Sequence, residues 1–404
     1  MQELDARDVP ALTAALRAAL AGGDAVLPVA DGPREPCDSV AGDGLALVIE
    51  TSGSTGTPKR VGLTASALRA SAEATYRWCD EFAGRVPKTR QWLLCLPAHY
   101  IAGAQVLVRS IIADTEPVVL VGRFTADSFV AAAGQLDAQA RYVSLVPVQL
   151  QRLLAAADSE TGGEADDNQV IDTVMRRFDA VLVGGQATPR QQLAAARERG
   201  WPIVTTYGAS ETAGGCVYNG QPLPGVIARE YDGEIWLSGS QLAAGYLGDP
   251  ERQSRTFIQR DGMRWYRTSD AGIVASASDG TTKVQVTGRL DQVIISGGEK
   301  VNLGAVERLV QSVPGYEAAV VIAVPHSEWG EAVGVVVEGS QSVSGDEPRQ
   351  LEAPAQLRHA CAAAGRAARP AVMIEVARIP RLASGKPDRQ ALRQIAAQLP
   401  VGHE

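Results

Sequence analysis

Short apolar runs alternate with amphipathic stretches between residues 45 and 215, and this alternation limits the fold more than any other feature. Runs of this length are typical of buried strands, and the longer stretches between them of helices. Strands that alternate with helices favour a layered α/β fold with a largely parallel sheet. The runs are LALVIE, WLLCLP, PVVLV, YVSLVP, DAVLVG and PIVTTYG, and helices are predicted at 66–82, 101–113, 127–140 and 189–199.

The pattern changes beyond this region. Short strands with turns over 231–295 predict a β-rich subdomain. The rest of the chain predicts a helix at 303–313, three further strands, an Ala-rich helix and a last helix after Pro387, with the polar stretch 340–350 as a surface loop. The fold class is therefore α/β: a large layered domain with a β-rich subdomain, then a small α+β domain.

Bulk composition narrows the partners. A chain of 404 residues can hold two domains. Its net charge of −8 argues against nucleic acid or an anionic membrane as the main partner. The five cysteines form no C-x-x-C pair, which indicates reduced thiols and no structural zinc. The N-terminus carries acids instead of the basic region of a signal peptide, so we expect a cytoplasmic protein.

The segment SGSTGTPK (52–59) follows the first apolar run and contains phosphate-binding groups. Its glycines allow close approach of the backbone, its hydroxyls can donate hydrogen bonds, and Lys59 supplies a cation. It is not a Walker A loop, because Pro58 precedes the lysine and Arg60 follows it. The alternative is a flexible Ser/Thr/Gly linker.

Six segments together resemble the adenylate-forming superfamily of acyl-CoA synthetases, luciferases and adenylation domains, and they occur in family order over most of the chain. They are TSGSTGTPK (51–59), GGQATP (184–189), TTYGASET (205–212), YRTSD (266–270), GRLDQVIISGGEKV (288–301) and ASGKPDR (383–389). The resemblance implies an AMP-forming acid–thiol ligase. Such an enzyme joins a carboxylate to ATP with Mg²⁺, releases pyrophosphate, and passes the acyl group to a thiol such as CoA.

The resemblance also implies residue roles. Tyr207 offers a flat face to adenine, Ser210 (threonine in most of the family) reaches a phosphate, and Asp270 accepts from the ribose hydroxyls with help from Arg289. Glu211 and Thr55 serve Mg²⁺, and Lys386 bridges the attacking carboxylate and the α-phosphate. The implied nucleotide and CoA contacts also include Thr51, Ser52, Gly53, Ser54, Gly56, Lys59, Gly184, Gly185, Gln186, Gly208, Gly297, Gly298 and Lys300.

Residues 289–291 separate a domain at 1–288 from a domain at 292–404. In the family the residue that matches Asp291 is a hinge about which the small domain turns after adenylation. The SGGEK segment (296–300) would then border the pantetheine tunnel. Asn302, Leu303 and Gly304 replace the usual Ser-Pro there, which puts the detailed CoA contacts in doubt.

The acid is indicated by a narrower resemblance. A short N-terminal region and the segment 97–114 are similar to bacterial o-succinylbenzoate:CoA ligases of menaquinone biosynthesis. His99, as a catalytic and pocket residue, and Tyr100 would shape the acyl pocket, together with Gly184 and Thr206. Arg109 lies on a largely apolar helix, and a buried arginine needs an anion, such as the second carboxylate of o-succinylbenzoate.

Alternatives stay open at this point. Arg109 could pair with an acid of the protein, and His99 could be a polar loop residue. The acid could be another aryl acid or a fatty acid, or the enzyme could stop at adenylation or form an amide. A nucleotide-binding module without catalysis is a further alternative, which the retained Lys386, Glu211 and Asp270 argue against. A homodimer is an open possibility for the assembly.

Overall fold

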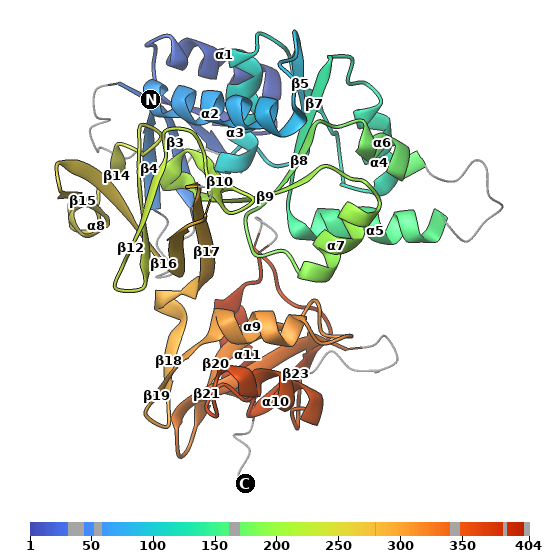
Figure 1. Cartoon of the computed structure of the whole chain (residues 1–404), viewed down its shortest axis with the longest axis vertical. Helices are drawn as coiled ribbons and strands as arrows, with labels where there is room; N and C mark the ends of the chain where they lie inside the picture. The colour runs from blue at the N-terminus through green and yellow to red at the C-terminus, as the bar shows by residue number, and fades with distance from the viewer. Residues whose placement is uncertain are drawn as a thin grey trace.

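The computed structural model describes residues 1–30, 44–51, 59–160, 170–278, 280–339, 348–382 and 386–399. Figure 1 shows a large upper lobe with two layered sheets and a β-rich part, and a smaller lobe below it. The mixed α/β class predicted from the sequence is confirmed. In the described ranges, no helix is long and apolar enough to cross a membrane.

A seven-stranded sheet forms the centre of the large lobe, in the order β11-β10-β9-β8-β7-β5-β6. Strands β5 to β9 are parallel, as the alternation predicts, and β10 runs antiparallel to β9. The strands are β5 (Arg90–Leu94), β6 (Val118–Val119), β7 (Ala140–Leu145), β8 (Ala180–Val183), β9 (Ile203–Ala209), β10 (Gly214–Tyr218) and β11 (Gln221–Pro222).

Helices cover both faces of this sheet because its strands are apolar on both sides. The helices α2 (Ala65–Ala83) and α3 (Ile101–Ile112) share a buried core with one face. The other face packs on a second core formed by four helices (Figure 1). These are α4 (Ala126–Ala133), α5 (Pro147–Glu160), α6 (Val170–Arg176) and α7 (Arg190–Glu198).

A second sheet of the large lobe has the order β1-β2-β3-β4-β14. The sequence pattern predicts that LALVIE leads into the helix at 66–82, but β4 lies between them and pairs antiparallel with β3. Two charged residues at the start of KRVGLT hide this strand from a search for apolar runs. The elements are β1 (Gln2–Asp5), α1 (Val9–Leu20), β2 (Val26–Val29), β3 (Leu45–Thr51), β4 (Lys59–Thr64) and β14 (Gly245–Leu247).

The predicted β-rich subdomain is an antiparallel sheet in the order β12-β13-β16-β15, with β17 also paired to β16. The β16–β17 register sets Asp270 opposite Arg289, which brings two motifs of the sequence together. The elements are β12 (Ile227–Tyr231), β13 (Glu234–Ser238), α8 (Pro250–Thr256), β15 (Phe257–Arg260), β16 (Met263–Ser276) and β17 (Thr282–Arg289).

The small lobe has a six-stranded sheet and its own buried apolar clusters. A 3-10 turn, η2 (Leu290–Gln292), connects β17 to it, and the hinge role of residues 289–291 stays a prediction. The elements are β18 (Val293–Ser296), β19 (Glu299–Asn302), α9 (Leu303–Gln311), β20 (Val320–His326), β21 (Gly330–Glu338), β22 (Arg349–Leu351), α10 (Ala355–Cys361), β23 (Val372–Val376) and α11 (Arg389–Gln398).

Candidate active site

Tyr207, Asp270 and Arg289 form one hydrogen-bonded group where β9 meets the β-rich sheet. The Tyr207 hydroxyl donates to Asp270 Oδ2 at 2.6 Å, and Arg289 Nη1 donates to Asp270 Oδ1 at 3.2 Å. Burial raises the pKa of Asp270 above its ordinary value, although both donors favour the ionised carboxylate. The group therefore presents a fixed, half-buried carboxylate on β16, beside β9.

A cavity of about 200 Å³ adjoins this group. Tyr207 lines it with Gln186 and Thr188 of the GGQATP segment, and Val284 and Val286 of β17 form an apolar wall. An apolar wall, a tyrosine ring and a neighbouring carboxylate could hold an aromatic base joined to a sugar with hydroxyl groups. Sequence reasoning missed the two valines, although the alternation in KVQVTG places both on one face of the strand.

Two glycines of the motifs lie where neighbouring atoms leave no room for a side chain. A Cβ at Gly184 would lie 2.2 Å from Thr206 Oγ1, and one at Gly208 would lie 2.1 Å from the carbonyl oxygen of Gly214. The structure therefore brings Gly184 and Thr206 together, and their role in acid binding stays a prediction. Gly185 has a positive φ of 85°, which favours glycine at the turn after β8.

Glu211 is buried, with 2% of its surface exposed, in the 3-10 turn η1 (Ser210–Thr212). Lys59 Nζ forms an ion pair with Glu211 Oε1, and the Tyr246 hydroxyl donates to the same oxygen at 2.7 Å. Burial opposes ionisation of Glu211, but the charge and hydrogen bond of Lys59, with the bond from Tyr246, lower its pKa below the ordinary value. Glu211 is therefore an ionised carboxylate held by two donors.

Glu211 could supply one ligand to a magnesium ion. The described ranges contain no cluster of three or more His, Cys, Asp or Glu side chains that could hold a metal by themselves. A Mg²⁺ usually takes one or two carboxylates and fills its other positions with phosphate oxygens and water, so a single glutamate fits a metal that arrives with a nucleotide. Thr55, the other predicted magnesium residue, lies outside the described residues.

The predicted phosphate loop is flanked by Thr51 and Lys59, which pair across β3 and β4. Residues 52–58, which include the predicted Ser52, Gly53, Ser54 and Gly56, lie outside the described residues. The Thr51 hydroxyl is buried without a hydrogen-bond partner, so it keeps an unused donor beside the loop. The loop therefore connects two antiparallel strands, and Lys59 extends from its end toward Glu211.

Lys386 of the small lobe lies close enough to the nucleotide residues for their charges to act on it. Partial desolvation of its ammonium group lowers its pKa below the ordinary value. The charges of Arg289 and Lys59 lower the pKa further, while those of Asp270 and Glu211 oppose this. A hydrogen bond of 2.8 Å from the backbone of Leu382 to the carbonyl oxygen of Lys386 fixes the chain just before α11.

Arg289 joins the two segments that flank the predicted hinge. Besides its bond to Asp270, it donates from Nε and Nη2 to the Asp291 carboxylate, at 3.0 and 2.6 Å. The Asn302 side chain accepts from the backbone N–H of Ala305 at 3.0 Å, so it caps α9. This explains a helix start at the position where the sequence departs from the family pattern.

Gly297 and Gly298 form the two-residue turn of the β18–β19 hairpin, with φ values of 55° and 85°. Such turns need positive φ at both positions, which explains the glycine pair. In Figure 1 this hairpin extends away from the large lobe, so the structure does not bring it to the nucleotide residues. Lys300, on β19, lies on the same hairpin.

His99 and Tyr100 lie in the turn before α3, with ring centroids 4.1 Å apart. The turn packs tightly on the helix, because a Cβ at Gly103 would lie 2.3 Å from the carbonyl oxygen of Pro97. Both side chains are half-buried, and burial raises the pKa of Tyr100. Gly103 was not predicted as a site residue, yet its lack of a side chain allows this close approach of the turn to the helix.

Arg109 is buried, with 3% of its surface exposed, and the described residues provide it with no acidic partner. Its Nη2 donates to the hydroxyls of Thr75 and Tyr218 at 3.3 and 3.2 Å, and its guanidinium lies 4.8 Å from the Trp92 ring centroid. Its Nε has no hydrogen-bond partner. The predicted alternative of an ion pair within the protein is therefore not found among the described residues.

Arg109 shares one face of α3 with Ile101 and Gln105, at spacings of four residues. This face packs against β10, whose first residue is Gly214. A Cβ added to Gly214 would lie 3.3 Å from Gln105 Cγ and 3.8 Å from Ile101 Cγ1. The Gln105 amide donates to the carbonyl oxygen of Ala213 at 2.6 Å, while its own oxygen is buried without a partner. Two buried polar atoms without partners, Gln105 Oε1 and Arg109 Nε, thus lie along one face of α3.

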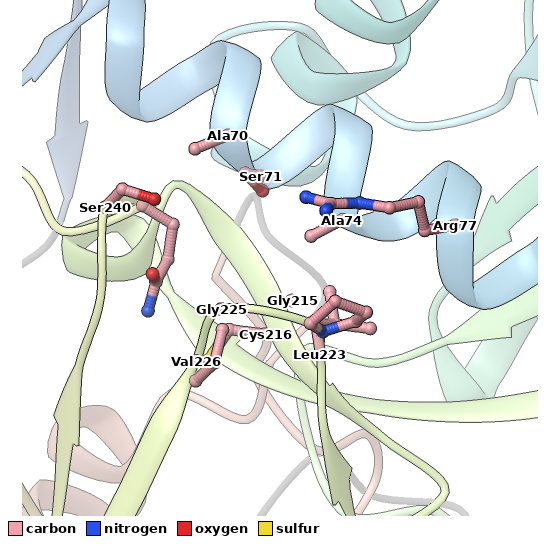
Figure 2. Close-up of a pocket in the computed structure, with 12 residues that line it drawn as sticks. Ala70, Ser71, Ala74, Arg77, Gly215, Cys216, Leu223, Gly225, Val226 and Ser240 are labelled. Carbon is pink, nitrogen blue, oxygen red and sulfur yellow. The ribbon is translucent and has the colours of Figure 1, made fainter.

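A second cavity, of about 50 Å³, lies between α2 and β10 (Figure 2). Ser71, Ala74 and Arg77 of α2 face Cys216 and Val226 across it. This volume holds at most a few water molecules, so the cavity is too small for an acid or a nucleotide.

Comparison with known proteins agrees with this geometry. Residues 4–247 match the family described as AMP-binding enzyme. The chain is 36% identical to a probable 2-succinylbenzoate–CoA ligase of Mycobacterium tuberculosis (strain ATCC 25618 / H37Rv), over 88% of this chain and 86% of that protein. A 2-succinylbenzoate–CoA ligase of Enterococcus faecalis (strain ATCC 700802 / V583) is 27% identical, over 75% and 61%.

A similar solved structure is o-succinylbenzoate CoA synthetase from Bacillus subtilis in complex with the acyl-adenylate intermediate OSB-AMP. Its TM-score is 0.68 at 25% identity, and the match covers 91% of this chain and 71% of that one. The family match takes in the strands β3, β4, β9 and β14, which carry Lys59, Tyr207 and Tyr246. The chain therefore belongs to the AMP-binding enzyme family.

Proposed function

We propose that this enzyme is an ATP-dependent acid:CoA ligase that converts o-succinylbenzoate to o-succinylbenzoyl-CoA, a step of menaquinone biosynthesis. The observation that carries the choice of acid is Arg109, a buried cation without an acidic partner among the described residues. Burying an unpaired charge is costly, so a site that retains one is suited to an anionic ligand. The ligase relatives from Mycobacterium and Enterococcus support the same choice.

In the first half-reaction, one carboxylate oxygen of the acid attacks the α-phosphorus of ATP. The bond from that phosphorus to the pyrophosphate oxygen breaks, and acyl-AMP and pyrophosphate form. Asp270 would hold the ribose, Tyr207 and the valine wall of β17 the adenine, and Lys386 would neutralise charge between the acid and the α-phosphate. A bound Mg²⁺, held through Glu211, would offset the charge of the phosphates.

In the second half-reaction, the sulfur of CoA attacks the acyl carbon. The bond from that carbon to the AMP oxygen breaks, AMP leaves, and the thiol proton passes to solvent. We propose that the small lobe turns about Asp291 between the two steps, because Lys386 now faces the nucleotide residues while the Gly297–Gly298 turn is directed away. The substrates ATP and CoA favour a cytoplasmic reaction.

The acid would bind along α3. Its reacting carboxylate would lie near His99 and Gly208, and its second carboxylate would reach Arg109, two helical turns beyond Ile101. Two hydroxyls already meet the guanidinium there, and the free Nε offers a further donor. A fatty acid has no second anion for this position, which argues against a fatty-acid ligase.

Pyrophosphate release with a panel of acids, with and without CoA, tests the proposal. We expect strong release with o-succinylbenzoate and a thioester product only when CoA is present. Release without thioester would indicate an enzyme that stops at adenylation, preference for another acid would refute the substrate, and no release with any acid would indicate a binding module without catalysis.

A further inference from the structure

Lys59 and Tyr246 both engage the carboxylate oxygen of Glu211 that would otherwise be available to a metal. Lys59 Nζ is paired with Oε1, and the Tyr246 hydroxyl donates to the same atom at 2.7 Å. The ammonium also lies 5.4 Å from the centroid of the Tyr246 ring. One buried oxygen therefore has two donors before any ligand is present.

Three separate elements hold this group in place. Lys59 begins β4, and Tyr246 lies on β14, where it pairs with Val61 of β4. Glu211 lies in the turn η1, and its carbonyl oxygen accepts from the backbone N–H of Ala243 at 2.8 Å. Strand pairing therefore positions Lys59 and Tyr246, and the backbone bond from Ala243 positions Glu211.

A metal and the ammonium cannot share that oxygen. Mg²⁺ binds carboxylate oxygens at about 2.0–2.1 Å and gives up its waters reluctantly. Two cations so close together in a buried site repel strongly, because little solvent screens them. The described ranges contain no cluster of three or more His, Cys, Asp or Glu side chains that could hold the ion by itself. A metal that takes this oxygen without nucleotide must therefore displace Lys59 from Glu211 and leave the ammonium without its counterion.

The polyphosphate of ATP changes this balance, since its charges give Lys59 another partner. We propose that Lys59 takes the place of the metal on Glu211 in the nucleotide-free enzyme and is drawn away by the phosphates, so that metal and nucleotide enter together. Tyr246 is a positioning residue that holds the carboxylate in both states. The inference rests on the nucleotide site of the proposed function, but not on which acid is activated.

Mn²⁺ binding to the nucleotide-free enzyme, followed by electron paramagnetic resonance of the free ion, tests this exchange. We expect wild-type enzyme to bind Mn²⁺ weakly and Lys59→Met to bind it about tenfold or more tightly, because the competing cation is gone. Lys59→Arg keeps a cation and should resemble wild type. The double variant Lys59→Met/Glu211→Gln should lose this increase in Mn²⁺ affinity, which would show that the ion binds Glu211.

Equal Mn²⁺ affinity in wild type and Lys59→Met would overturn the exchange, and so would tight binding to wild type without nucleotide. Lys59→Gln provides a second variant if Lys59→Met does not fold. For it, Mg²⁺ alone should raise the melting temperature, whereas wild type should respond only to Mg²⁺ with ATP. These assays contain no acid and no CoA. The exchange of Lys59 for the metal on Glu211 can therefore be correct even if o-succinylbenzoate is the wrong substrate.

Discussion

Replacing Arg109 by methionine tests whether this arginine binds the acid or only stabilises the fold. The guanidinium is a charged donor that would face the second carboxylate, and a hydrogen bond to a charged group contributes about 1.5–3 kcal/mol. Since about 1.4 kcal/mol corresponds to a factor of ten, the KM for o-succinylbenzoate should rise about 10-fold to 150-fold. The KM for ATP should stay unchanged, because the contacts of Arg109 are to Thr75, Tyr218 and Trp92, and none of these is a predicted nucleotide residue.

The same substitution should cost little stability. Methionine fills a similar space beside Trp92. Thr75 Oγ1 and the Tyr218 hydroxyl are 3.1 Å apart and still hydrogen-bond to each other, so neither hydroxyl is left without a partner. The lost contact between the cation and Trp92, about 2 kcal/mol when desolvated, is offset because a buried charge no longer needs to be desolvated. We expect the free energy of unfolding to change by less than about 1.5 kcal/mol.

The assay compares steady-state kinetics with o-succinylbenzoate and with 4-oxo-4-phenylbutanoate, which lacks the aromatic carboxylate, together with urea unfolding. Arg77→Met, at an exposed position of α2 beside the small cavity, is a matched control that should leave both substrates unaffected. A loss of about 3–5 kcal/mol of stability, as when a buried ion pair is broken, would refute the assigned role. An unchanged KM for o-succinylbenzoate would refute it as well.

Four further predictions follow from the site. Lys386→Ala should slow adenylation by orders of magnitude and spare thioester formation from supplied acyl-adenylate; equal loss in both half-reactions would rule out its role. Because the pKa of Lys386 is lowered, the wild-type adenylation rate should fall as pH rises through a value below 10.5, and Lys386→Arg should lack this fall. Tyr207→Phe removes the donor to Asp270 and should raise the KM for ATP about tenfold without changing the KM for the acid, as initial rates would show. Gly103→Ala should lower stability by about 1–3 kcal/mol in urea unfolding, since its Cβ would lie 2.3 Å from a carbonyl oxygen, and an unchanged midpoint would mean that the turn before α3 can relax.

Periodicity predicted the architecture because the parallel strands are short apolar runs separated by helices. It missed β4, where Lys59 and Arg60 precede the apolar residues, and so it did not show that the phosphate loop connects antiparallel strands. The glycine positions were easier to predict, since close backbone approach and positive φ leave few alternatives at Gly184, Gly208 and the β18–β19 turn.

The partners of the site residues were harder to predict, because strand pairing and helix packing bring them together over long distances in the chain. Tyr246 lies in none of the six motifs, and it contacts Glu211 because β14 pairs with β4. Thr75 and Tyr218, which hydrogen-bond to Arg109, lie 34 and 109 residues from it along the chain. The sequence indicated an arginine that needs an anion, but only the packing shows that the described residues do not provide one.

The measurement that tests the central claim most directly is exchange of labelled pyrophosphate into ATP, with o-succinylbenzoate as the acid and no CoA. Exchange requires reversible formation of the acyl-adenylate, so it reports the reaction at the α-phosphorus alone. We predict rapid exchange that depends on o-succinylbenzoate and is lost in Lys386→Ala. Exchange that does not depend on the acid, or none with any carboxylate, would contradict the account.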